Sequence, residues 1–136
     1  MNELVASLEG NLIERFQELA GRLRGEHQNV VVSVTSFDEG QRTPNSRRTI
    51  AIECLFTDAP TADSNNVGLI VVIEHLNARS RLSAHVGWGD PSGYVEDEFR
   101  PEPVQLSSET LQELYAALPT LCKSFESSVV RRKPST

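Results

Sequence analysis

The sequence predicts a single α+β domain, with a leading helix, a four- to five-stranded mainly antiparallel sheet, and a closing helix. Apolar residues recur at helical spacing near both ends of the chain. Between these ends the hydrophobic period changes to two, as in strands. The length of 136 residues suits one hydrophobic core and leaves too little chain for a second.

The first part of the chain has the pattern of an amphipathic helix. Its apolar residues fall on one stripe, namely Leu4, Leu8, Leu12, Phe16, Leu19 and Leu23. Charged residues, among them Glu9, Glu14, Arg15, Glu18 and Arg22, lie outside this stripe, and Gly25 supplies a helix stop. The pattern therefore predicts a helix over residues 2–24.

Two strands are predicted after this helix. Residues 30–35 are rich in β-branched side chains, and residues 49–56 alternate between apolar and mixed positions. The polar segments 38–47 and 57–66 contain Gly, Pro and Asn, which are turn-forming residues. We therefore expect loops at these two segments.

Residues 67–76 and 79–88 predict a β-hairpin. With Ala78 and Arg79 as a two-residue loop, Leu69 faces Trp88 across the hairpin. One face is then apolar, consisting of Leu69, Val71, Ile73, His75, Leu82, Ala84, Val86 and Trp88. The other face is mixed, consisting of Ile70, Val72, Glu74, Leu76, Arg81, Ser83, His85 and Gly87. This division is typical of an antiparallel sheet covered on one side.

A short edge strand at residues 94–99 and a final helix beginning near Ser107 or Ser108 complete the predicted fold. The helix has a continuous apolar stripe, namely Leu111, Leu114, Tyr115, Leu118, Leu121, Cys122, Phe125 and Val129. Pro119 lacks a backbone donor, so we expect the helix to be kinked or split there. The domain is predicted to span residues 1–130, with a basic disordered tail at 131–136.

The charge is acidic and unevenly distributed. The formal net charge is -6, but residues 1–130 contain 10 Lys+Arg against 19 Asp+Glu, a net of -9. An acidic body repels phosphate backbones and attracts basic proteins, which disfavours nucleic acid as a partner. No secretory signal or membrane-spanning run is visible, and only two cysteines are present, so we expect a cytoplasmic protein with free thiols.

No residue pattern in the chain predicts catalysis, a bound metal or a cofactor. His75 and His85 are expected on opposite faces of the hairpin, so they cannot share a metal ion. Glu96 and Glu98 would lie about 7 Å apart on one face of an extended strand. Such a pair can bind a divalent ion or serve acid–base chemistry, although a solvated acidic edge is the more common role.

The segment after the hairpin is the best candidate for a partner-binding surface. It combines an aromatic residue with a local acidic run, namely Asp90, Tyr94, Glu96, Asp97 and Glu98. Aromatic side chains surrounded by carboxylates suit a basic protein surface, since the charges speed encounter and the rings fill pockets. Trp88 is expected in the core, which leaves Tyr94 as the anchor.

The order of elements resembles the small immunity proteins that accompany bacterial polymorphic toxins. The resemblance consists of a leading helix, a hairpin-rich sheet, the run Val86-Gly87-Trp88-Gly89-Asp90 followed by Gly93, Glu96 and Glu98, and a leucine-rich helix. It implies a non-enzymatic, acidic protein that inhibits a cognate toxin by binding it. Proteins of this class differ so widely that the resemblance transfers no binding residue by position.

Two other functions remain open. A secretion chaperone has similar size, charge and α+β composition, but such chaperones usually have a further helix between strands, for which residues 67–88 leave no room. A small-molecule pocket is the other alternative, lined by the mixed hairpin face with Ile70, Val72, Glu74, Leu76 and His85.

Overall fold

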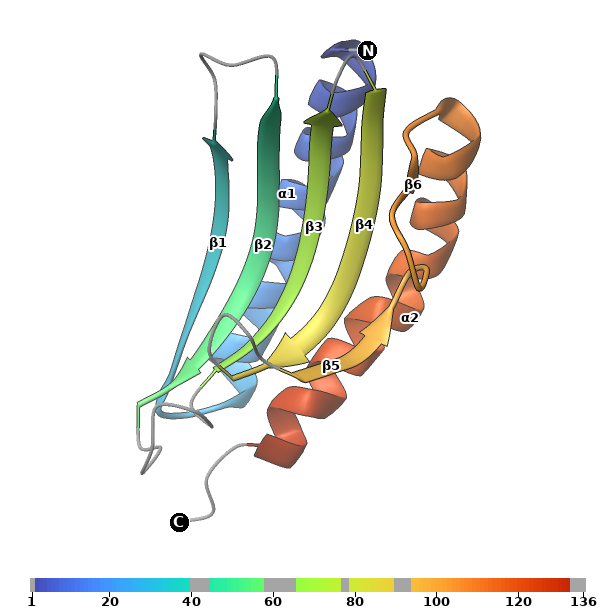
Figure 1. Ribbon diagram of the computed structural model, residues 1–136. Coiled ribbons are helices and arrows are strands. Elements are labelled where there is room, and N and C mark those ends of the chain that lie inside the picture. Colours follow the sequence, from blue (N-terminus) through green and yellow to red (C-terminus); the bar gives the residue numbers. More distant parts are fainter. Residues whose placement is uncertain (1, 40–44, 58–65, 77–78, 90–93, 133–136) are drawn as a thin grey trace.

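The structure is a computed structural model that describes residues 2–39, 45–57, 66–76, 79–89 and 94–132. Its elements follow the chain in the order α1 (Asn2–Glu26), β1 (Val30–Glu39), β2 (Ser46–Phe56), β3 (Asn66–Leu76), β4 (Arg79–Trp88), β5 (Tyr94–Glu98), β6 (Val104–Gln105) and α2 (Ser108–Arg132). The predicted α+β fold class, with a helix at each end of an antiparallel sheet, is confirmed (Figure 1).

The strands form one antiparallel sheet in the order β1-β2-β3-β4-β5. The short strand β6 pairs with the opposite half of β4, so β5 and β6 together line one edge. β6 was not expected from the sequence, because two residues after Pro101 and Pro103 have no recognisable strand pattern.

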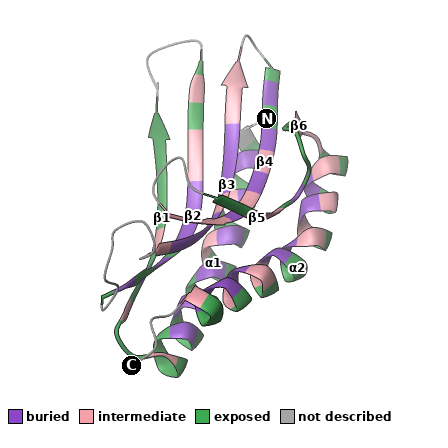
Figure 2. Cartoon of the chain, turned by 60° about the horizontal axis from the view of Figure 1, so that its bottom comes forward, coloured by how far each residue is buried: buried purple, intermediate pink, exposed green. Residues whose placement is uncertain are grey.

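Both helices pack on the same face of the sheet and enclose one core. α1 lies against β1 and β2, and α2 lies against β3, β4 and β5. Figure 2 shows the buried residues on the sides of the helices and strands that face each other. The central side chains are completely buried, namely Phe16, Phe125, Leu8, Leu12, Ile50, Ile52, Leu69, Ile73, Leu82 and Leu114. The predicted apolar stripes of both helices therefore form the core.

The β3–β4 hairpin pairs in a register that differs from the prediction by two residues. Leu69 lies opposite Val86 and not opposite Trp88, and the hairpin closes at the pair Leu76 and Arg79. The two-residue turn is therefore one residue earlier than predicted, and its residues lie outside the described part of the chain. Because side chains alternate with a period of two, this shift leaves every hairpin side chain on its predicted face.

α2 continues through Pro119 and extends further than predicted. It is one helix from Ser108 to Arg132 and is not split at Pro119, whose ring is exposed on the side away from the sheet. Arg131 and Arg132 were expected in a disordered tail, but they belong to the last turn of α2 and form ion pairs with Glu96. The remaining tail residues lie outside the described part of the chain.

Candidate functional site

One face of the sheet has no described helix packed on it. This open face is formed by the odd-numbered residues of β1, β2 and β4 and the even-numbered residues of β3. In Figure 1 it faces the reader, with α1 behind the sheet. It corresponds to the mixed face that the hairpin pattern predicts, extended across the other strands.

Exposed apolar side chains are concentrated on the open face and its β5 edge. Of the six large hydrophobic residues that are exposed in the described chain, five lie here: Val31, Phe37, Leu55, Tyr94 and Val95. The sixth is Val130 on α2. Single exposed hydrophobics are common on protein surfaces, whereas several on one uncovered face are typical of a binding surface.

The charges on the open face differ between its two ends. At one end Glu39, Arg47, Glu74 and Arg81 are neighbours across four strands, so opposite charges alternate. The other end has Glu53 on β2 and Glu98 on β5, and neither carboxylate forms an ion pair with a described residue. This end of the open face is therefore acidic and attracts cations.

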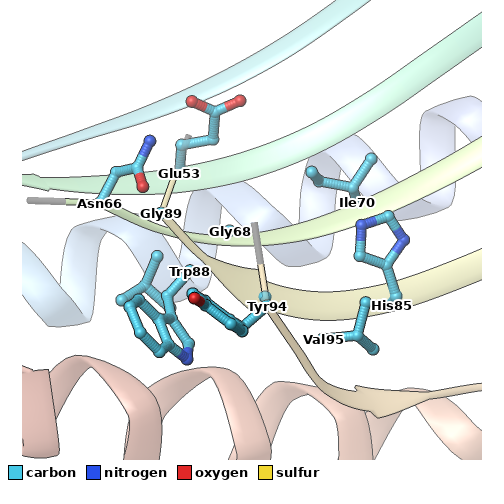
Figure 3. A pocket seen from close by; sticks show the side chains of 11 residues that line it. Glu53, Asn66, Gly68, Ile70, His85, Trp88, Gly89, Tyr94 and Val95 are labelled. Carbon is cyan, nitrogen blue, oxygen red and sulfur yellow. The ribbon is translucent and has the colours of Figure 1, made fainter. Parts of the chain in front are cut away.

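A hollow of about 370 Å³ opens at the acidic end. Gly68 of β3 lies opposite Gly87 of β4, and the absence of two adjacent side chains leaves a depression in the sheet surface. Around it lie Glu53, Asn66, Ile70, His85, Trp88, Tyr94 and Val95. Figure 3 shows Glu53 and Asn66 toward one end and His85 and Ile70 toward the other. The Oδ1 atom of Asn66 is buried and has no hydrogen-bond partner among the described residues.

The two glycines of the hollow have different structural roles. At Gly87, where the β4–β5 register shifts in a β-bulge, an added Cβ would lie 2.8 Å from the carbonyl oxygen of Tyr94. Only glycine therefore permits this approach of the two strands. At Gly68 an added Cβ would meet only ordinary contacts of 3.6 Å, with side-chain atoms of Glu53 and Ile70. The fold does not require a glycine at position 68.

Trp88 joins the hollow to the end of α2. Its ring stacks on Tyr94 with centroids 4.5 Å apart, and the guanidinium carbon of Arg132 lies 3.5 Å from its centroid. Two groups at these distances cannot share one ring face, so Trp88 lies between Arg132 and Tyr94. Trp88 is half-buried, as a residue at the margin of the core, and Tyr94 is 68% exposed.

Glu96 is bound within the protein. Its carboxylate accepts hydrogen bonds from Arg132 at 2.6 Å and from Arg131 at 2.5 Å. Burial by itself raises the pKa of Glu96, but the two guanidinium groups outweigh this effect and hold the pKa below its ordinary value of 4.5. Glu96 thus fixes the end of α2, and through Arg132 it also positions Trp88.

The other predicted partner-binding residues have different surroundings. Asp97 accepts a hydrogen bond of 2.6 Å from the Ser124 hydroxyl on α2. Glu98 is exposed and lies opposite His85 on the open face. Tyr94 is exposed beside the hollow, and Asp90 lies outside the described residues. The structure therefore brings Glu98 to the open face and leaves Tyr94 exposed at the β5 edge, whereas Glu96 and Asp97 contact α2.

The prediction that Glu96 and Glu98 share one face of their strand is wrong. Val95 pairs with Gly87 and Asp97 with Val86, so Glu96 is the extra residue of the bulge. An extra residue interrupts the alternation of side chains. As a result Glu96 contacts α2 while Glu98 lies beside His85, and the two carboxylates do not form a pair.

His85 lies at the acidic end but is held in its neutral form. Its imidazole is half-buried, and this burial lowers its pKa below the ordinary value of 6.5. Glu98 opposes the shift by attracting a proton, and Arg47 adds to it. His75 lies on the opposite face, as predicted, with Nδ1 2.5 Å from the Ser80 hydroxyl. The two histidines therefore cannot share a ligand.

The remaining features concern metal binding, thiol reactivity and membrane spans. The described residues contain no group of three or more His, Cys, Asp or Glu side chains placed to bind a metal ion. Cys54 is buried, and burial raises the pKa of the half-buried Cys122 thiol, which lowers its reactivity. Neither α1 nor α2 has, over its described length, a stretch long and apolar enough to cross a membrane.

The larger part of the candidate surface has no recognisable signal in the sequence. Phe37 lay between the predicted strand 30–35 and the predicted loop 38–47, whereas β1 extends to Glu39, and Val31 and Leu55 were expected only as strand residues. The glycine pair was hidden because the predicted register placed Gly68 two residues out of alignment with Gly87. Of the five residues proposed for a small-molecule pocket, only Ile70 and His85 line the hollow.

Comparison with known proteins gives no further assignment. No protein-family model matches the chain, and neither the curated proteins nor the solved structures include a match.

Proposed function

We propose that this chain is a non-enzymatic protein-binding module, and that it acts as an immunity-type inhibitor of a basic bacterial toxin domain in the cytoplasm. The observation that best supports the proposal is the group of exposed apolar side chains on the uncovered face of the sheet. Residues such as Phe37 and Leu55 would contribute apolar area to an interface with a partner.

The charge distribution supports a basic partner. The formal net charge of the chain is -6, and Glu53 and Glu98 add a local negative potential at one end of the open face. Opposite charge speeds the encounter of two proteins and disfavours acidic competitors. The alternating charges at the other end of the open face would fix the alignment of the partner on the sheet, and they add no net attraction.

The proposal is tested by co-expression with the protein encoded immediately upstream of this chain in its source genome. We expect that protein, or its C-terminal domain, to stop growth of a host when expressed alone, and the present chain to restore growth. Leu55→Glu combined with Phe37→Glu should abolish the protection, because both charges would be buried in the interface.

Val130→Glu is the matched control, since Val130 is also an exposed apolar residue, more exposed than Phe37 and Leu55, but lies on α2. Protection by wild type and by this control, with loss in the double variant, would support the proposal. Growth arrest that the wild-type chain does not relieve, or a neighbour that is harmless, would refute the inhibitor assignment.

Small-molecule binding is a second candidate, and the hollow beside Gly68 is the observation that favours it. A volume of about 370 Å³ is at the lower end of the range for ligand pockets. A metabolite that binds only the native state would raise the melting temperature. A screen in which one compound raises it, and Gly68→Val removes the effect, would favour this function over inhibition.

A further inference from the structure

We infer that the hollow at the acidic end of the open face binds the guanidinium group of an arginine side chain on the protein partner. This inference rests on the proposed function, because it assigns one contact within the proposed interface. It specifies where the partner is anchored and which chemical group the partner must supply.

The hollow owes its shape to two facing glycines. Gly68 and Gly87 are directly opposite each other, so the sheet surface is bare over two adjacent positions. The bulge requires glycine at position 87, but nothing in the surrounding packing requires it at position 68. A strand interior normally disfavours glycine, and its presence often marks a place where a ligand or another chain approaches closely. The depression is therefore a candidate for occupation by a partner.

The polar groups around the hollow select a cation. The carboxylate of Glu53 is exposed on one side and forms no ion pair with a described residue. Nearby, the buried Oδ1 atom of Asn66 is an acceptor that finds no donor in the described chain. Buried acceptors are almost always hydrogen-bonded in native structures, so this atom can take a donor from beyond the described residues. A group with several N–H donors and a positive charge satisfies both oxygens.

The aromatic side of the hollow selects a planar cation. One face of Trp88 is occupied by Arg132 and the other by Tyr94, which leaves the outer side of Tyr94 exposed. Guanidinium groups stack on aromatic faces and donate in their own plane, so one arginine can contact Tyr94 and hydrogen-bond to carboxylate and amide oxygens. A lysine ammonium is a compact charge without this planar fit.

The state of His85 is compatible with a bound cation. Its side chain lines the end of the hollow away from Glu53, as Figure 3 shows. A protonated imidazole there would repel a guanidinium group, but the half-buried ring favours the neutral form. The hollow therefore has negative charge at Glu53 and no opposing positive charge from His85 at neutral pH.

The inference is tested with short peptides and the full-length chain. Trp88 is the only tryptophan in the sequence, so its fluorescence reports directly on the hollow. The probe is acetyl-Gly-Arg-Gly-amide, compared with the same peptide containing lysine or citrulline in place of arginine. Citrulline retains the planar shape without the charge. We expect saturable binding of the arginine peptide, with roughly tenfold weaker binding of the citrulline peptide.

Two variants with matched controls locate the site. Gly68→Val fills the depression and Glu53→Gln removes the charge without changing the shape. Each variant is expected to bind the arginine peptide roughly tenfold more weakly than wild type does. Ser83→Val and Glu74→Gln make the same kinds of change on the open face outside the hollow, and should leave binding unchanged. A melting temperature near that of wild type shows that the variants are folded.

The outcomes separate this inference from the proposed function. Equal binding of the arginine and citrulline peptides, no saturable response in wild type, or unaltered binding in both Gly68→Val and Glu53→Gln would overturn the arginine site. If growth protection by the wild-type chain is nevertheless intact, the partner uses the open face without this anchor. Arginine binding without growth protection would support the site and refute the inhibitor function.

Discussion

Replacing Gly87 with alanine should destabilise the protein, whereas the same replacement at the facing Gly68 should not. An alanine Cβ at position 87 would lie 2.8 Å from the Tyr94 carbonyl oxygen, where about 3.4 Å is the closest comfortable contact. β4 and β5 would have to separate by about 0.6 Å at a point where they are hydrogen-bonded. Overpacking of this kind costs about 1–3 kcal/mol.

The effect at Gly68 is expected to have the opposite sign. The new Cβ would meet only flexible side-chain atoms at 3.6 Å, and alanine reduces the entropy of the unfolded chain. The gain should be roughly 0.4–1 kcal/mol. For a chain of this length about 3–5 °C of Tm corresponds to 1 kcal/mol. Gly87→Ala should therefore lower Tm by about 3–15 °C, and Gly68→Ala should raise it slightly.

Urea denaturation followed by circular dichroism and by Trp88 fluorescence measures both variants. The two probes also test whether the β5 edge unfolds together with the rest of the protein. If Gly87→Ala has the stability of wild type, or if Gly68→Ala is destabilised as much as Gly87→Ala, then the described difference between the two glycines is wrong. The geometry of the hollow would then need revision.

Three further predictions concern local interactions. Glu96→Gln should lower the free energy of unfolding by about 1–2 kcal/mol, because it removes the charge that pairs with Arg132. The lowered pKa of Glu96 gives a stabilisation that is present above pH 4.5 and is lost as the pH falls below it. The variant should therefore lose less stability than wild type on acidification below pH 4.5. His85 binds a proton less readily in the folded protein than in the unfolded chain, so the stability of wild type should decrease as the pH falls through 6.5. The urea midpoint of His85→Gln should not show this decrease. Ser107→Ala should cost about 1 kcal/mol in thermal unfolding, since Ser107 and Thr110 cap α2 reciprocally, whereas Ser108→Ala should be nearly neutral.

The sequence allowed the fold class and the faces of most elements to be predicted. The stripes of α1 and α2 and the alternation along β2, β3 and β4 are strong signals because every buried position contributes to them. Alternation also explains why an error of two residues in the hairpin register did not change any face. Which face the helices cover could not be predicted from the hairpin alone.

The candidate site was less accessible to prediction, because it depends on pairings between distant residues. The bulge that rotates Glu96 toward α2 is set by the approach of Gly87 to Tyr94, and a bulge leaves no reliable pattern in a strand of five residues. The ion pairs of Arg131 and Arg132 with Glu96 join residues that are 35 and 36 positions apart in the sequence. From the sequence alone, a basic run at a terminus indicates a solvated tail, because the carboxylate that it pairs with cannot be recognised.

We propose above that the open face of the sheet binds another protein. The most direct test is isothermal titration of the purified chain with the purified, catalytically inactivated C-terminal domain of the protein encoded upstream. We expect a one-to-one complex that Phe37→Glu with Leu55→Glu weakens by at least about 100-fold, while Val130→Glu leaves the affinity unchanged. Equal affinities for wild type and the double variant, or a loss confined to Val130→Glu, would place the interface elsewhere and contradict the claim.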